Sequence, residues 1–120
     1  MDQIFKERLL SLGFEQKLET LFSIEVEHKL YTTSNKWLLF AYFEDDKYYF
    51  SNNGDLVSSF DTPDIDIVSM LEDIKDEIGK FGCYLNGSKI VKEINLNSFE
   101  NDLDDFVSAV YKVDKMYEDL

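Results

Sequence analysis

Cys83 and His28 are the only cysteine and the only histidine of the chain, and together they have the chemistry of a thiol–imidazole catalytic pair. Such a pair needs a hydrogen bond between the two side chains, and no local catalytic signature surrounds either residue. His28 alternates with Val26 and Leu30, so we expect it on a strand, facing the same side as these apolar residues. We favour a core or rim histidine with a satisfied hydrogen bond and a small buried cysteine, with an enzyme using His28 or Cys83 as the alternative.

The segment Asn52-Asn53-Gly54-Asp55 has the composition of a calcium-binding loop, and its register can be tested. Placing Gly54 at the sixth position of such a loop puts Tyr49 at the first position and Phe60 at the twelfth. Neither side chain is a calcium ligand, so the register excludes this site.

Two further groups of carboxylates imitate metal sites. Asp64 and Asp73-Ile74-Lys75 resemble a nuclease signature, but we expect both parts on one helix rather than on strands that converge on a metal. Asp104 and Asp105 are adjacent, and neighbours on a helix point about 100° apart. The chain also has no glycine-rich phosphate loop. We therefore expect no catalytic residues, no metal and no cofactor, and a protein that is not an enzyme.

The composition describes a folded and strongly acidic protein. Its 120 residues are enough for a single domain, 1–120, with a modest core. Hydrophobic residues make up 44% and aromatic residues 15%, which is too apolar for disorder even though 12 − 25 gives a net charge of −13. The longest apolar run, Trp37–Phe43, is too short to span a bilayer, and the charged N-terminus has no signal sequence. A lone cysteine also fits a reducing compartment, so we expect a cytoplasmic protein.

Apolar spacing predicts a helix followed by strands in the first half of the chain. A helical period covers Ile4–Leu12 and stops at Gly13, and a second short helical piece is expected over Leu18–Phe22. From Ile24 to Leu30 apolar residues alternate, as in a half-buried strand. Every residue of Trp37–Phe43 is apolar, which predicts a central strand covered on both faces.

Lys47–Ser51 is the next expected strand, after a turn at Glu44–Asp46. Asn53-Gly54 then has the residues of a tight hairpin turn. The tyrosines of this region either fill the core or form an exposed patch, and the sequence leaves both options open for Tyr31, Tyr42, Tyr48 and Tyr49.

Two helices and a hairpin are expected in the second half of the chain. Thr62-Pro63 has the residues of a helix start, and this helix ends at Gly82. Its apolar stripe consists of Ile67, Met70, Leu71, Ile74, Ile78 and Phe81. A hairpin with its turn at Asn86-Gly87 follows, and then Asn97 and Glu100 resemble a capping box. The stripe of the last helix consists of Phe99, Leu103, Phe106, Val110, Val113 and Tyr117.

These elements predict an α+β fold. Its antiparallel sheet has a three- to four-stranded meander plus a late hairpin, and three helices pack mainly on one face of the sheet.

Most of the negative charge lies in two stretches. Residues 61–82 and 98–120 each contain seven acids and two lysines, so each has a net charge of −5, and together they hold −10 of the −13. In the last helix the acids of residues 100–105 crowd the N-terminal end, where the helix dipole favours negative charge. No partner is needed to explain them.

The middle helix carries its acids differently. Glu72 with Asp76 and Asp73 with Glu77 are like-charged pairs four residues apart, which cost about 0.2–0.5 kcal/mol each. The acids at 72, 73 and 76 project opposite the apolar stripe, so the helix presents a charged face at a cost in stability. We predict that this face binds a partner through Asp66, Glu72, Asp73, Asp76 and Glu77.

Two segments, Tyr48–Leu56 and Tyr84–Val91, each combine a strand with an Asn-Gly turn. This arrangement resembles a family of small uncharacterised phage and prophage proteins, over residues 20 to 117. In that family the first turn is of the Thr-Asp-Asp-Gly kind, whereas Asn52 and Asn53 replace the acidic pair here, so no role for carboxylates in that turn carries over. The resemblance implies a mobile-element setting.

The leading hypothesis is a phage-type inhibitor that binds the basic nucleic-acid-binding surface of a host defence protein as a DNA mimic, by analogy with other small acidic phage proteins. The alternative is an immunity protein or antitoxin that binds a cognate toxic enzyme. We expect any charged partner to be basic, because a strongly negative chain repels nucleic acid and anionic lipid. We expect no direct binding to nucleic acid and none to a membrane.

Overall fold

The computed structural model describes residues 3–30, 33–52, 54–58 and 66–116, and within them the side chains other than those of residues 26–30, 33–37, 55 and 58. The helices are α1 (Gln3–Ser11), α2 (Asp55–Ser58), α3 (Ile67–Gly79), the 3₁₀ turn η1 (Leu96–Ser98) and α4 (Phe99–Met116). The strands are β1 (Glu15–Leu18), β2 (Leu21–Leu30), β3 (Thr33–Glu44), β4 (Lys47–Asn52), β5 (Tyr84–Asn86) and β6 (Lys89–Ile94).

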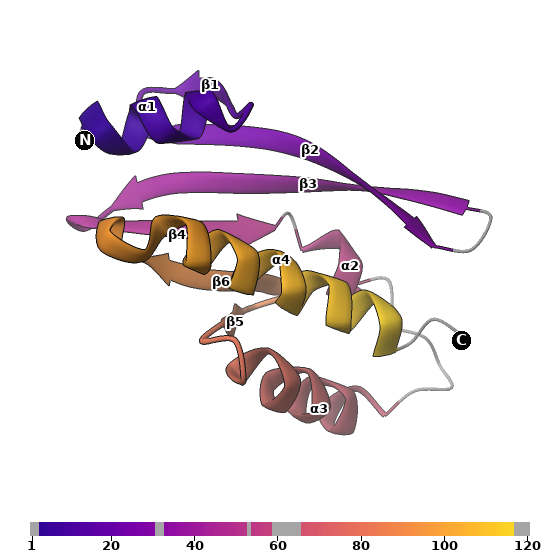
Figure 1. Cartoon of the computed structure of the whole chain (residues 1–120). Coiled ribbons are helices and arrows are strands. Elements are labelled where there is room, and N and C mark those ends of the chain that lie inside the picture. Colours follow the sequence, from indigo (N-terminus) through magenta and orange to yellow (C-terminus); the bar gives the residue numbers. More distant parts are fainter. Residues whose placement is uncertain (1–2, 31–32, 53, 59–65, 117–120) are drawn as a thin grey trace.

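The strands form one antiparallel sheet in the order β1-β2-β3-β4-β6-β5 (Figure 1). The first four strands are a meander, and the β5–β6 hairpin is added beside β4 after the chain has passed through α2 and α3. The outer parts of β2 and β3, from Glu25 paired with Leu38 to Leu30 paired with Thr33, continue as a two-stranded ribbon beyond the end of β4. The predicted α+β class, with a meander and a late hairpin, is confirmed.

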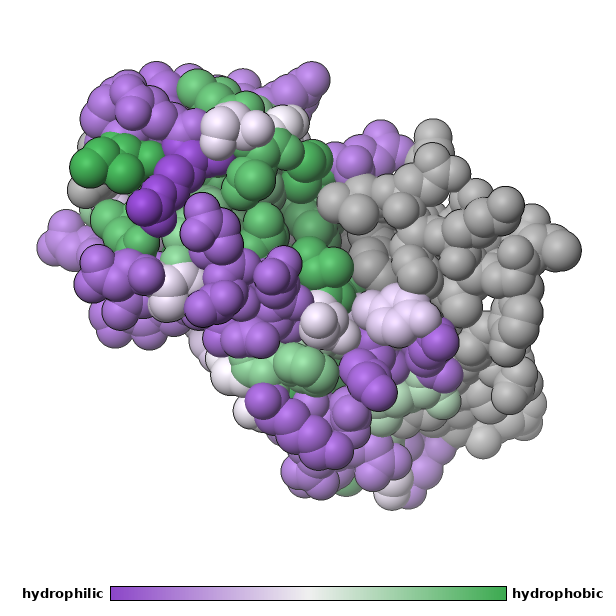
Figure 2. Space-filling model, in the orientation of Figure 1, coloured by the Kyte–Doolittle hydropathy of each residue, from purple (hydrophilic) through white to green (hydrophobic). Residues whose placement is uncertain are grey.

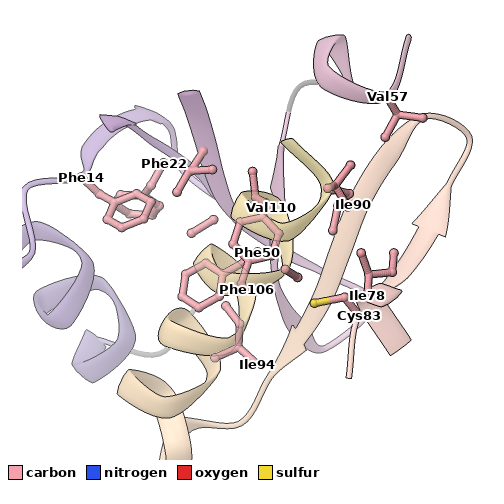
Figure 3. Close-up of a cluster of buried hydrophobic side chains, with 14 of the residues drawn as sticks. Phe14, Phe22, Phe50, Val57, Ile78, Cys83, Ile90, Ile94, Phe106 and Val110 are labelled. Atoms are coloured by element: carbon pink, nitrogen blue, oxygen red, sulfur yellow. The ribbon is translucent and has the colours of Figure 1, made fainter. Parts of the chain in front are cut away.

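The hydrophobic core lies between one face of the sheet and the helices. Phe50 occupies its centre, with its ring centroid 5.8 Å from that of Phe106 and 5.6 Å from that of Phe99 on α4 (Figure 3). Phe5 of α1 also packs against Phe99, with their ring centroids 5.7 Å apart. Ile74 and Ile78 of α3 join the same buried cluster. The three longer helices thus cover one face, as expected.

The opposite face of the sheet carries aromatic side chains that none of the described helices covers. Strand residues alternate between faces, and the register puts Phe40, Tyr42 and Tyr49 on the side opposite Ala41 and Phe50. None of these three belongs to the core cluster of the described residues. The prediction that β3 is covered on both faces is therefore wrong for the described part of the chain.

The turn between β3 and β4 lies where the sequence predicts it, and two later turns differ from the prediction. Asp45 and Asp46 connect β3 to β4 with positive φ angles of 52° and 62°, the combination that a two-residue type I′ hairpin requires. No hairpin turn follows β4: Gly54, with φ of 85°, leads into α2 instead, and Asn53 lies outside the described residues. The β5–β6 turn lies one residue later than predicted, because Asn86 still pairs with Lys89 and Gly87 takes the positive φ.

The element boundaries also differ where several residues compete for one role. The segment Leu18–Phe22 is not helical, since it ends β1 and begins β2. The predicted start at Thr62-Pro63 lies outside the described residues, and α3 begins at Ile67 with Asp66 as its N-cap. Before α4, Asn95 caps the 3₁₀ turn η1 by accepting from the backbone N–H of Asn97, and its own backbone N–H donates to Asp102 Oδ2 at 2.8 Å. The predicted Asn97–Glu100 box is therefore wrong.

Candidate protein-binding surface

The sheet keeps the backbones of Cys83 and His28 apart. Cys83 directly precedes β5, and three strands separate β5 from β2, so His28 lies on a strand four spacings away, about 19 Å. Cys83 is only 6% exposed, and burial raises the pKa of its thiol to about 11 against the opposing effect of Lys92. The His28 side chain lies outside the described residues. A low-pKa nucleophile is therefore absent at Cys83.

No group of three or more carboxylate, imidazole or thiol side chains is placed to hold a metal ion among the described residues. Asp73 lies on α3 with Lys75, and Asp64 lies outside the described residues. The helices that are described likewise include none with the length and apolar character of a membrane span.

The structure separates the five predicted partner-binding residues on α3 into two groups. Glu72, Asp73 and Asp76 are exposed and form no ion pair with a described lysine or arginine. Asp66 is engaged as the N-cap, where its Oδ1 accepts from the backbone N–H of Val68 at 3.0 Å. Glu77 is half-buried and its Oε2 lies 3.0 Å from Lys80 Nζ.

The acids of α4 also fall into two groups, and this corrects the explanation by the helix dipole. Asp102 is half-buried and completes the cap, accepting from Asn95 N–H and from Ser98 Oγ at 3.1 Å. Asp104 and Asp105 are exposed in the second turn, because α4 begins at Phe99. The dipole acts mainly within the first turn, so it does not account for these two acids.

A buried lysine joins the two acidic helices. Lys92 of β6 is 8% exposed, and its Nζ donates to the carbonyl oxygen of Phe81, in the turn that follows α3, at 2.8 Å. The same Nζ lies 3.9 Å from Asp102 Oδ1 in the first turn of α4. Because α3 and α4 run antiparallel (Figure 1), this places the C-terminal end of α3 next to the N-terminal end of α4.

The acids of both helices therefore gather at one end of the helical layer. They come from the second half of α3 and the first half of α4, two stretches separated by the whole β5–β6 hairpin in the sequence. Hydrophilic residues predominate over the lower part of the surface, where α3 lies (Figure 2). Sequence reasoning missed Asp104, Asp105 and the role of Lys92, because the neighbourhood of α3 and α4 is not visible in the local pattern.

The fold and this surface define an acidic α+β protein with one helical face and one open sheet face. Comparison with protein-family models, with curated proteins and with solved structures gives no match. The resemblance to phage and prophage proteins therefore stays a hypothesis.

Proposed function

We propose that this chain is a cytoplasmic binding protein, not an enzyme, that uses its acidic helical layer to occupy the basic nucleic-acid-binding surface of another protein. The partner would be a host DNA-binding protein, and the mobile-element setting implied by the resemblance is part of the proposal. The observation that supports it is that exposed carboxylates of α3 and α4, with no ion pair to a described lysine or arginine, lie at the same end of the helical layer.

The spacing of charge along each helix supports mimicry of DNA. Residues 72–77 contain four acids and one lysine, and Lys80 next to Glu77 reduces their sum to −2 over about 9 Å of helix, or one charge per about 4.5 Å. Residues 100–105 contain four acids, and Lys92 next to Asp102 reduces their sum to −3 over the same length. One strand of B-DNA carries one phosphate per about 3.4 Å of axis. Two adjacent helices thus approximate two lines of phosphates.

The test is capture of partners from a host lysate by the immobilised chain, followed by displacement with salt or with a short DNA duplex. We expect captured proteins to be basic, to elute as salt rises, and to be displaced by the duplex because both ligands use one surface. Asp73→Asn with Asp76→Asn should weaken capture, chiefly by slowing association. Asp104→Asn with Asp105→Asn should weaken it to a similar extent.

A third double variant, Asp45→Asn with Asp46→Asn, provides the charge-matched control. It removes two acids from the β3–β4 turn, and asparagine tolerates the positive φ at both positions. Equal weakening by all three variants would show that only net charge matters and would contradict a defined surface. A captured toxic enzyme that DNA does not displace would instead favour the immunity-protein alternative.

A further inference from the structure

The open face of the sheet, opposite the acidic helices, has a regular row of side chains across its strands. The register aligns Ser23, Phe40 and Ser51 on β2, β3 and β4, and continues through Val91 of β6 to Tyr84 of β5. Both serines are nearly buried, at 5% and 4% exposure. Phe40, which is half-buried, is therefore the large side chain between two small residues and forms a low ridge that lines two hollows.

Each side of this ridge is a hollow. One hollow, of about 420 Å³, lies over Ser23 and is lined by Leu38 and Phe40 among others. The second, of about 410 Å³, lies over Ser51 and is lined by Phe40 and Tyr42 among others. A cavity of about 150 Å³ already accepts benzene, so either hollow has room for a phenyl ring.

The described part of the open face is also nearly neutral, in contrast to the chain as a whole. Its described charged side chains are Glu15, Lys17, Glu25, Glu44, Lys47, Lys89 and Glu93. Four acids and three lysines give a net charge of −1, compared with −13 for the chain. Two ion pairs offset charge within this set, Lys17 with Glu15 at 2.8 Å and Lys47 with Glu93 at 3.6 Å.

These features favour a second copy of the chain as the partner that covers the open face of the sheet. A two-fold interface requires a self-complementary surface, and a ridge beside a hollow of matching size meets that requirement. Two copies facing each other through their sheets keep both acidic helical layers on the outside, where their mutual repulsion is smallest. A foreign partner that recognised acidic charge would instead approach the helical side.

We propose that the open sheet faces of two copies pack together, with Phe40 of each copy inserted into a hollow of the other. Sheets packed in this way lie about 10 Å apart and interdigitate their side chains. Five strand spacings by six residues give a footprint of about 24 × 20 Å, below the about 800 Å² per partner of a standard interface. The dimer is therefore weak and depends on concentration. This inference does not rest on the proposed function.

Sedimentation velocity of the full chain at about 0.15 M salt, over micromolar to near-millimolar concentrations, tests the proposal. We expect a monomer that converts to a dimer as concentration rises. Phe40→Asp should weaken dimerisation by at least about tenfold, because it buries unpaired charge near the two-fold axis. Val68→Asp, at a 70% exposed position of α3, adds the same charge on the other side and should change it less than about twofold.

Leu38→Asp provides a second variant in case Phe40→Asp does not fold, because Leu38 lines the first hollow and is already 37% exposed. Melting curves establish that each variant used is folded. A wild-type chain that stays monomeric throughout would overturn the proposal and leave the face to a foreign partner. Dimerisation that survives a folded Phe40→Asp or Leu38→Asp variant would also overturn it, as would an equal loss in Val68→Asp.

Discussion

Lys92→Met tests whether the buried lysine holds the two acidic helices together. Methionine keeps a flexible apolar stem of similar length, so the change removes mainly the ammonium group. That group donates to the Phe81 carbonyl at 2.8 Å and lies 3.9 Å from Asp102 Oδ1. A hydrogen bond from a charged donor contributes about 1.5–3 kcal/mol, and Asp102 keeps its contacts with Asn95 and Ser98, so we expect a loss of about 2 kcal/mol.

Urea unfolding followed by tryptophan fluorescence and circular dichroism measures this loss, and the melting temperature should fall by about 6–10 °C. Lys47→Met is the control, since its ion pair with Glu93 spans 3.6 Å between side chains that are both more than half exposed. An exposed pair of this kind contributes less than about 1 kcal/mol. If Lys92→Met and Lys47→Met reduce the free energy of unfolding equally, Lys92 does not join the helices in the way its geometry indicates.

Three further predictions concern single features. Asp66→Ala should cost about 1 kcal/mol of unfolding free energy and Asp66→Asn much less, because asparagine can still cap α3; equal losses in denaturant titrations would argue against the cap. The raised pKa of Cys83 means that the stabilisation from its neutral thiol is intact below about pH 9 and is lost as pH rises toward 11. Cys83→Ala should therefore show a shallower decline of stability over that interval, and an unchanged slope would exclude this thiol as a cause. Finally, the melting temperature should rise between low salt and about 0.15 M salt, where the Debye length is about 8 Å, and a flat response would mean that the acids are locally compensated.

The sequence predicted elements well where the local pattern has one solution. Met70, Ile74 and Ile78 of the predicted stripe repeat at helical spacing and are all buried, whereas Ile67 is 38% exposed and Phe81 lies beyond the end of α3. Caps and turns were less predictable, since nearby residues of the same type compete for one role. Asn95 and Asn97 are both suited to cap a helix, and only the reciprocal contact with Asp102 selects Asn95.

The candidate surface could also be predicted only in part, because it combines residues that are far apart in the sequence. The exposed acids of α3 follow from its helical period, because a polar face opposite an apolar stripe points away from the core. Asp104 and Asp105 lie at the same end of the helical layer as the acids of α3 only because α4 runs antiparallel to α3 (Figure 1), with Lys92 in contact with the ends of both. That arrangement depends on where β6 inserts into the sheet, and no local pattern records the strand order.

The unbroken apolar run of β3 explains why the second face was misjudged. A run without alternation indicates that both faces of a strand are apolar, and burial on both faces is the usual reason. In this structure Leu39 and Ala41 face the helices, whereas Phe40 and Tyr42 face a side that no described helix covers. The run therefore predicts correctly that both faces of β3 are apolar, but it does not predict what covers each face. If a second copy covers the open face, β3 is buried on both sides in the dimer, and the expectation from its sequence holds for the assembly rather than for the single chain.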